Sequence, residues 1–451
     1  MAEDLELKKS RIRELITGRR YADLRATLTE MPPPDLSDLL LDMERSERLL
    51  LFRFLPRELA TEVFSHMDAP AKDVLLESLT DSEARRLLAT LSPDDRTHFL
   101  EEVPGLAIQR LLNLLSHNDF REAMQLLGYP EESVGRLMTP DYVAVRPDWT
   151  IEQALTHIRK KGIESETINI IYVTDRSWKL LDALELKKLI LAAPTGTVES
   201  LMDYSFTALP ADADREAAVQ VIARYDLVAL PVVDSQGVLL GIVTVDDVLD
   251  VAEQEATEDF HRTAAVEPLR GSYRESGVWL LVRKRIGWLL FLIVINLVAS
   301  GIIAAHEEIL AAAIALAFFM PLLSAAGGNV GAQSATIVIR AQATGDIKLG
   351  QWLITVAKEL RVGVFLGMMM AAVAWFVGLI YGGPQVALVV ALSMLCNVLF
   401  INVLAAVMPF VLTRLGLDPA AASGPLITSM ADPISLLVYF SMAAFLLHLH
   451  T

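Results

Sequence analysis

Long apolar runs alternate with short polar breaks over the last third of the chain. A helix needs about 20 mostly apolar residues to cross a hydrocarbon core of about 30 Å. Five runs reach about that length, and the breaks between them carry charged or turn-forming residues. The runs cover residues 286–305, 309–338, 362–382, 385–412 and 419–448. We therefore expect five membrane-spanning helices at this end of the chain.

Residues 32–115 follow a shorter period. They divide into units of twelve residues, from PPPDLSDLLLDM to PGLAIQRLLNLL, and each unit opens on turn or capping residues and ends on apolar ones. A fixed short period predicts short helices that stack into a solenoid. Acids near the start of a unit, such as Asp94 and Asp95, are expected to be helix N-caps rather than metal ligands.

Residues 137–252 contain a second repeat. LMTPDYVAVRPDWTIEQAL (137–155) aligns with LMDYSFTALPADADREAAV (201–219), so that Leu137 corresponds to Leu201. INIIYVTD (168–175) and LVALPVVD (227–234) are apolar runs of strand length that end in aspartate. The second copy continues as GVLLGIVTVDDVLDV (237–251), which predicts a strand, a turn and a second strand that lead into a helix. An acidic helix from about residue 246 connects this repeat to the apolar runs.

The distribution of charged residues also separates the apolar runs at the end of the chain from the part that precedes them. Residues 286–451 hold five of the 39 basic and six of the 56 acidic residues, so the part of the chain before Ile286 carries 34 − 50 = −16. Such an acidic part excludes nucleic acid as a partner, because binding to phosphates needs basic surfaces. It favours cations instead.

The breaks between the apolar runs predict the orientation in the membrane. Basic residues precede the first run and lie between the second and third and between the fourth and fifth, while the other breaks have no Lys or Arg. The positive-inside rule makes these sides cytoplasmic and puts the C-terminus outside. The N-terminus lacks an apolar signal core, and the one cysteine, Cys396, lies in an apolar run. We expect a multi-pass plasma-membrane protein whose N-terminal parts are cytoplasmic.

One acid, Asp432, lies inside an apolar run. A charge at the centre of a span costs about 2.5–3.5 kcal/mol, and no basic residue lies at matching depth. Asp432 is therefore either a protonated, hydrogen-bonded acid or a carboxylate whose counter-charge is a transported cation. Pro433 cannot donate to the carbonyl of Ser429, nor Pro425 to that of Ala421. Free carbonyls beside a carboxylate suit Mg²⁺ or Ca²⁺.

Other polar residues in the second and fifth runs have two interpretations. They can mediate helix packing, because small and hydroxyl-bearing side chains let helices approach and bond, or they can line a pore with Asp432. The pore-lining candidates are Asn329, Gln333, Thr336, Ala421, Thr428, Ser429 and Ser435.

The second repeat resembles a tandem CBS-domain pair in its MTP opening (138–140), its LPVVD strand (230–234) and its GIVTVDDVLD ending (241–250). The resemblance implies a module that binds adenosine nucleotides or ions and gates an attached module. The first copy departs from the pattern, since Lys187 and Lys188 stand where the family has a ribose-binding acid. This departure speaks against nucleotide binding, so ATP is retained only as an alternative ligand.

The order of regions, together with GGNVGAQSATIVIRA (327–341), DPAAASGP (418–425) and ADPISLLVYF (431–440), resembles the bacterial MgtE magnesium channels over nearly the whole chain. The resemblance implies a multidomain fold. Its parts are an all-α helical-repeat N-domain (1–131), an α/β tandem CBS pair (132–252), a connecting or plug helix (253–277) and a transmembrane domain of five helices (278–451). It also implies a homodimer in membrane lipid, with Asp432 of each chain holding a hydrated Mg²⁺ in a shared pore.

The resemblance further implies regulation by Mg²⁺. Bound ions would neutralise acidic faces and close the cytoplasmic mouth through the connecting helix. The implied sensor acids are Asp214, Glu216, Asp226, Asp247, Asp250, Glu255, Glu258 and Asp259, with Asp95, Glu359 and Asp418 as further candidates. Ala332 replaces an asparagine of the family motif, and Pro433 and Ser435 depart from the family pattern after the aspartate.

Two other functions remain open. The chain could be an ion-coupled transporter of another divalent metal, such as Co²⁺ or Mn²⁺, which dependence of flux on a proton or sodium gradient would reveal. It could also be a non-transporting membrane sensor, which an absence of flux would support. An enzyme is not expected, because the sequence has no Ser/His/Asp grouping, P-loop or zinc-ligand spacing.

Overall fold

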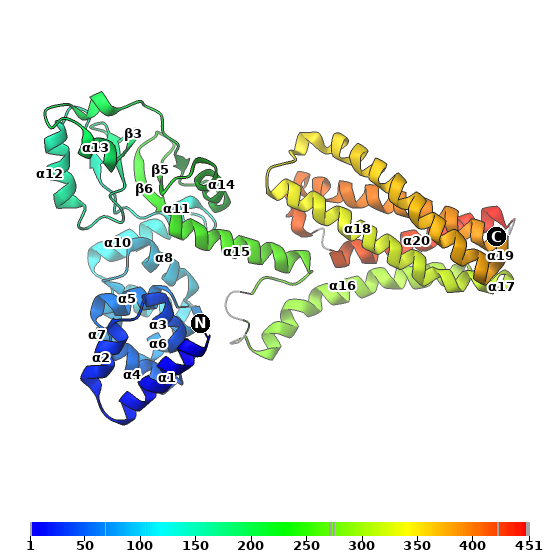
Figure 1. Ribbon diagram of the computed structural model, residues 1–451, viewed down its shortest axis with the longest axis horizontal. Helices are drawn as coiled ribbons and strands as arrows, with labels where there is room; N and C mark the ends of the chain where they lie inside the picture. The colour runs from blue at the N-terminus through cyan, green and yellow to red at the C-terminus, as the bar shows by residue number, and fades with distance from the viewer. Residues whose placement is uncertain are drawn as a thin grey trace. The chain divides into compact units, whose positions relative to one another are not determined.

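The computed structural model describes residues 2–67, 69–103, 105–269, 273, 276–421 and 424–447. Ser423, one of the polar residues of the fifth apolar run, lies outside these ranges. The chain forms two compact units, one made mainly of the residues up to Glu255 and the other of residues 256–269 and 276–451. Each unit is described on its own (Figure 1).

The first unit opens with a stack of short helices. The helices are α1 (Ala2–Thr17), α2 (Tyr21–Thr29), α3 (Pro33–Leu41), α4 (Arg45–Phe54), α5 (Arg57–Ser65), α6 (Ala69–Ser78), α7 (Asp81–Leu88), α8 (Pro93–Glu102), α9 (Gly105–Leu112) and α10 (His117–Leu126). From α3 to α9 they begin at residues 33, 45, 57, 69, 81, 93 and 105, which confirms the twelve-residue period. Helices this short are unstable alone, so their apolar faces share one core, including Leu36, Leu51 and Phe64.

The second repeat forms two matching α/β copies. The first has α11 (Val134–Leu137), β1 (Ala144–Val145), α12 (Ile151–Lys161), β2 (Ile170–Thr174), β3 (Leu180–Glu185) and α13 (Leu186–Leu191). The second has η1 (Val198–Leu201), β4 (Leu209–Pro210), α14 (Arg215–Tyr225), β5 (Ala229–Val233) and β6 (Leu239–Thr244). Helices α12 and α14 begin at Ile151 and Arg215, which correspond in the sequence alignment of the copies, so that alignment is confirmed.

Both copies use the same sheet. In each, the first strand pairs in parallel with the second, and the second pairs antiparallel with the third. Asp175 and Asp234 directly follow the middle strands, where each carboxylate accepts two backbone hydrogen bonds and closes the turn. The sheets share a small apolar core around Tyr172 and Ile242, so the copies form one module. Helix α15 (Val245–Thr263) follows β6 directly and runs from the first unit into the second.

The second unit is a bundle of long apolar helices (Figure 1). They are α16 (Val278–Ala305), α17 (Glu307–Ala312), η2 (Ile314–Phe319), α18 (Met320–Ala343), η3 (Leu349–Gln351), α19 (Trp352–Arg414), η4 (Pro419–Ala421) and α20 (Gly424–Leu446). Within the described residues four stretches are long and apolar enough to cross a membrane. The longest of them turns back at Gly383, whose φ of 76° breaks α19 into two arms. The described part of the bundle thus has five long arms.

Two details differ from the pattern in the sequence. The second apolar run is split into α17, η2 and α18 rather than being one helix. Pro425 lies in the first turn of α20, where backbone N–H groups have no helical partner in any case. The expected loss of a helical hydrogen bond to Ala421 is therefore wrong, because Ala421 belongs to η4. Pro433 does lie inside α20.

Glycines let α18 pack closely against α20 and against the second arm of α19. A Cβ atom on Gly327 would lie 2.6 Å from Ile401 Cδ1 and 2.8 Å from Ser435 Oγ. A Cβ atom on Gly331 would lie 2.6 Å from Ile427 Cγ2. These distances are shorter than carbon contacts allow, so the GGNVG stretch is required for this close approach.

Replacing Gly327 with alanine tests this packing. We expect Gly327→Ala to destabilise the bundle by about 1–3 kcal/mol, because the added methyl group overpacks a site with no free space. Thermal unfolding of the full chain in detergent measures the effect. Gly301→Ala on α16 is the matched control, because its Cβ would meet nothing within 4 Å. Equal midpoints for the two variants would contradict the packing role of Gly327.

Candidate functional site

Asp432 lies half-buried on α20, on the side that faces α18. The helices run antiparallel there, since Ser324 is within hydrogen-bonding reach of Asp432 and Gly328 lies against Thr428. Ser324 was not expected from the sequence. Among the described residues no basic side chain forms an ion pair with Asp432. The carboxylate therefore has a hydroxyl beside it but no fixed counter-charge in the described part of the chain.

A polar face of α18 lies next to this carboxylate. Asn329, Gln333 and Thr336 follow one another at helical spacing, and all three are exposed in the single chain. Ser334, on the opposite side of the helix, is buried. Polar side chains within a span do not face lipid readily, so this face requires a partner chain or water against it.

Other pore-lining candidates lie inside the bundle. Ser435 is 1% exposed and donates to Asn397 Oδ1 at 2.8 Å, and Asn397 Nδ2 donates to the carbonyl of Leu323 at 2.9 Å. Ser429 is also buried. Both serines are thus buried where α20 packs against the rest of the bundle. Thr428 and Asp432 instead lie together on the side of α20 that faces α18. Ala421 lies in η4, and its side chain is outside the described part.

Glu359 occupies a separate polar contact at the start of α19. Its Oε2 accepts hydrogen bonds from Ser334 Oγ at 3.0 Å and Asn402 Nδ2 at 3.1 Å. These bonds join α18 to both arms of α19. The sequence contains a pattern from which this contact could have been predicted. Glu359, Gly363 and Gly367 are spaced four residues apart and so share one face of the helix. The two glycines on that face pack against the second arm.

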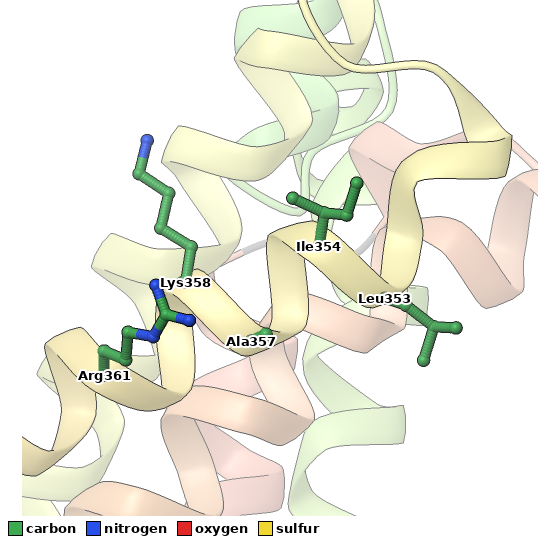
Figure 2. Close-up of a pocket in the computed structure, with 5 residues that line it drawn as sticks. All are labelled: Leu353, Ile354, Ala357, Lys358 and Arg361. Atoms are coloured by element: carbon green, nitrogen blue, oxygen red, sulfur yellow. The ribbon is translucent and has the colours of Figure 1, made fainter.

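The basic residues near Glu359 are exposed and do not form an ion pair with it. A pocket of about 530 Å³ at the start of α19 is lined by Leu353, Ile354, Ala357, Lys358 and Arg361. Figure 2 shows Lys358 and Arg361 projecting from the same side of the helix. Both are exposed, and no acid among the described residues is paired with either. They therefore do not neutralise the carboxylates inside the bundle.

The first unit contains a crowded set of acids, which we call the α8–α15 cluster. Its members are Asp94 and Asp95 on α8, Glu166 before β2, and Asp246 and Asp247 on α15. Asp94 is 8% exposed, and its Oδ1 has no hydrogen-bond partner among the described residues. The N-cap of α8 is Ser92, so the N-cap role expected for Asp94 is wrong.

Burial and mutual repulsion perturb the α8–α15 cluster. Burial raises the pKa of Asp247 well above its ordinary range, and the nearby charge of Asp94 adds to this. Burial likewise raises the pKa of Asp94 and of Glu166, and neighbouring carboxylates reinforce both shifts. Thr244 Oγ1 donates to Asp247 at 2.8 Å and opposes the shift only in part. A divalent cation would relieve this repulsion.

The remaining sensor candidates of the first unit are more dispersed. Asp214 caps α14 by accepting the backbone N–H of Glu216, and Asp226 ends the same helix in a left-handed conformation. Glu255 forms an ion pair with Arg215 at 2.6 Å. The side chain of Asp250 is exposed, and partial desolvation together with nearby acids raises its pKa. These acids thus already have structural partners or lie apart from the α8–α15 cluster.

A second set of acids lies in the second unit, around the end of α15. Glu258 and Asp418 both contact the guanidinium of Arg262. Burial raises the pKa of Asp259, and the charge of Asp418 adds to the shift, while Arg262 and Arg340 lower it. Within the described residues no three His, Cys, Asp or Glu side chains are grouped so as to hold a metal ion directly. An ion that keeps its waters, as Mg²⁺ does, needs only one or two carboxylates.

Comparison with known proteins assigns the family. The profile of divalent cation transporters matches residues 320–442, that of the MgtE intracellular N domain matches 31–132, and that of the CBS domain matches 134–193 and 198–253. Over 429 residues the chain is 40% identical to the magnesium transporter MgtE of Thermus thermophilus, covering 94% of this chain and 95% of the relative. The chain belongs to the MgtE family.

Other relatives agree. The chain is 31% identical to the magnesium transporter MgtE of Bacillus subtilis, covering 97% of each. It also resembles a crystal structure of the cytosolic domain of the Mg²⁺ channel MgtE in complex with ATP, with 36% identity, a TM-score of 0.52, and coverage of 54% of this chain and 99% of the other. MgtE proteins are transporters, and the chain is not an enzyme. The expected fold class of helical N-domain, CBS pair and apolar helical region is confirmed.

The acid pair Asp94 and Asp247 predicts a pH dependence. The folded protein keeps protons on these carboxyls that the unfolded chain releases near pH 4, so folding stability falls as pH rises from about 4 to about 8. Without divalent cations, we expect the thermal midpoint of the full chain in detergent to drop between about pH 6 and about pH 8.5. Mg²⁺ should reverse the drop.

Asp247→Asn is the matched variant, because it keeps an acceptor for Thr244 but cannot ionise. We expect a smaller drop with pH and a smaller gain from Mg²⁺ in this variant. An identical pH dependence in the two proteins would show that the pair does not titrate as described.

Proposed function

We propose that this chain forms a homodimeric Mg²⁺ channel of the plasma membrane that takes up magnesium and is closed by cytoplasmic Mg²⁺. Its N-terminal helices and CBS pair lie in the cytoplasm, and its C-terminus lies outside. Mg²⁺ is then both the transported ion and the regulator. The observation that carries the proposal is a half-buried carboxylate, Asp432, without a fixed counter-charge among the described residues and beside an exposed polar helix face.

The polar face of α18 supports the dimer. Asn329, Gln333 and Thr336 are exposed in the single chain, and exposure of such a face to lipid is unfavourable. A second copy related by two-fold symmetry would cover one side of this face and leave a polar path along it. Two Asp432 carboxylates would then meet, and two like charges stay ionised only with a cation between them.

Hydration chemistry favours Mg²⁺ as the ion. Mg²⁺ loses its waters reluctantly and is bound through them by one or two carboxylates, which matches one aspartate from each chain. Thr428 and Gln333 offer further oxygen atoms for water-mediated contacts. Pro433 leaves the carbonyl of Ser429 without its helical N–H partner, which adds a further oxygen near the carboxylate.

The acids around α15 support regulation. Asp94 and Asp247 meet in the α8–α15 cluster, and Glu258, Asp259 and Asp418 meet at the other end of α15. Mg²⁺ bound at either end would favour the arrangement that brings these acids together. Because α15 connects the CBS pair to the membrane helices, it is the element through which bound Mg²⁺ would close the pore.

ATP is a less favoured ligand of the CBS pair. The relative of known structure was solved with ATP, which keeps this ligand in consideration. In this chain Lys188 lies 3.8 Å from Asp203 as an ion pair, at the place where the family has an acid for the ribose. Loss of that acid removes an acceptor for the ribose hydroxyls.

Replacing Asp432 tests the pore. We expect Asp432→Asn, reconstituted into liposomes, to carry Mg²⁺ at least tenfold more slowly, since loss of the counter-charge to a divalent ion costs on the order of 1.4 kcal/mol or more. A fluorescent Mg²⁺ indicator inside the vesicles measures the flux. Asp346→Asn, at an exposed position between α18 and η3, is the matched control and should keep the normal rate.

Normal flux through Asp432→Asn would contradict the assignment of Asp432 to the pore. Flux that depends on an imposed proton or sodium gradient would favour an ion-coupled transporter instead. An absence of flux in the unmodified protein would favour a membrane sensor.

A further inference from the structure

Arg262, near the end of α15, contacts two carboxylates at once. One guanidinium nitrogen donates to Asp418, which lies between α19 and η4, and another pairs with Glu258, one turn earlier on α15. The side chains of Glu258 and Asp418 are 24% and 29% exposed, so water screens these ion pairs only in part. All three residues belong to the second unit. Arg262 thus joins the end of α15 to a loop of the membrane bundle.

The loop that holds Asp418 leads directly into α20. Asp418 Oδ1 accepts the backbone N–H of Ala420 at 2.7 Å, while Oδ2 contacts Arg262. Asp418 is therefore anchored to the turn η4, and α20, which carries Asp432, begins at Gly424. A bond from Arg262 to Asp418 fastens the connecting helix to the start of the helix that carries the pore acid.

The contact needs no metal ion. Glu258, Asp259 and Asp418 would repel one another if they were brought together alone. The guanidinium offsets part of that repulsion with a charge that is part of the chain, and its planar fork suits two carboxylates. A divalent cation that bound Glu258 and Asp418 would have to replace Arg262 at these oxygens.

We propose that Arg262, Glu258 and Asp418 form a latch that favours the closed channel when cytoplasmic Mg²⁺ is absent. The latch sets the fraction of channels that open at low Mg²⁺, and Mg²⁺ bound at the α8–α15 cluster then adds further closure. This inference rests on the proposed function, in which α15 closes the cytoplasmic mouth.

Inside-out membrane patches test the latch, with Mg²⁺ in the pipette as the permeant ion and EDTA on the cytoplasmic side. We expect Arg262→Gln to raise the ratio of open to closed time by roughly 1.5- to fivefold, the range for a partly exposed ion pair. Arg262→Lys, which keeps the charge but not the fork, should give a smaller rise.

Arg283→Gln is the matched control, because it removes an exposed basic residue of α16 that no described acid contacts. An unchanged ratio in Arg262→Gln would overturn the latch, as would an equal rise in Arg283→Gln. Adding Mg²⁺ to the same patches separates the two proposals. If Mg²⁺ closes every variant but the ratio in EDTA does not change, only the latch fails, whereas loss of Mg²⁺ closure in the unmodified channel refutes the regulation.

Discussion

A carboxylate inside an apolar bundle needs a positive charge, and the described part of this chain provides none at Asp432. The Ser324 hydroxyl lies beside the carboxylate, and one turn earlier on α20 Thr428 packs against Gly328. Basic residues such as Lys358 and Arg361 project outward at the start of α19 (Figure 2). Because an isolated buried charge is costly, an ionised Asp432 in the proposed channel takes its counter-charge from the transported ion. A hydrated Mg²⁺ between two copies of Asp432 meets this requirement.

Acidic residues that need a positive charge also occur at the two ends of α15, and among the described residues only one of these ends has a basic residue to supply it. At the α8–α15 cluster no described basic residue is paired with Asp94 or Asp247, and their raised pKa values express burial and the repulsion between them. At the far end Arg262 supplies part of the missing charge to Glu258 and Asp418. The charge of Arg262 is part of the chain and does not vary, whereas a cation at the α8–α15 cluster would come and go with its concentration. The proposed regulation thus rests on the same physics as the proposed pore.

Close packing makes the arrangement possible. Gly327, Gly328 and Gly331 bring α20 against α18 at distances that no Cβ atom would allow. Behind this contact, Glu359 binds Ser334 and Asn402 and fixes α18 to both arms of α19. Asp432 is therefore held on a closely packed helix pair, while the polar face of α18 stays exposed in the single chain, where the proposed dimer would cover it.

Much of the fold followed from pattern. The twelve-residue period predicted the short helices from α3 to α9, the alignment of the second repeat with itself predicted the paired CBS copies, and apolar length predicted the long arms. The site was only partly predictable, because helical spacing alone does not say which side of a helix a neighbour covers. Ser435 shares α20 with Asp432 yet bonds Asn397 in the interior, and Asp94 is buried against α15 rather than capping α8. Both depend on contacts between elements that are distant in the sequence.

Recording of single channels in inside-out patches, with cytoplasmic Mg²⁺ varied, tests the central claim most directly. The account predicts a Mg²⁺ current that needs no proton or sodium gradient and whose open fraction falls as cytoplasmic Mg²⁺ rises. A protein that carries no Mg²⁺ current, or whose current is indifferent to cytoplasmic Mg²⁺, would contradict it.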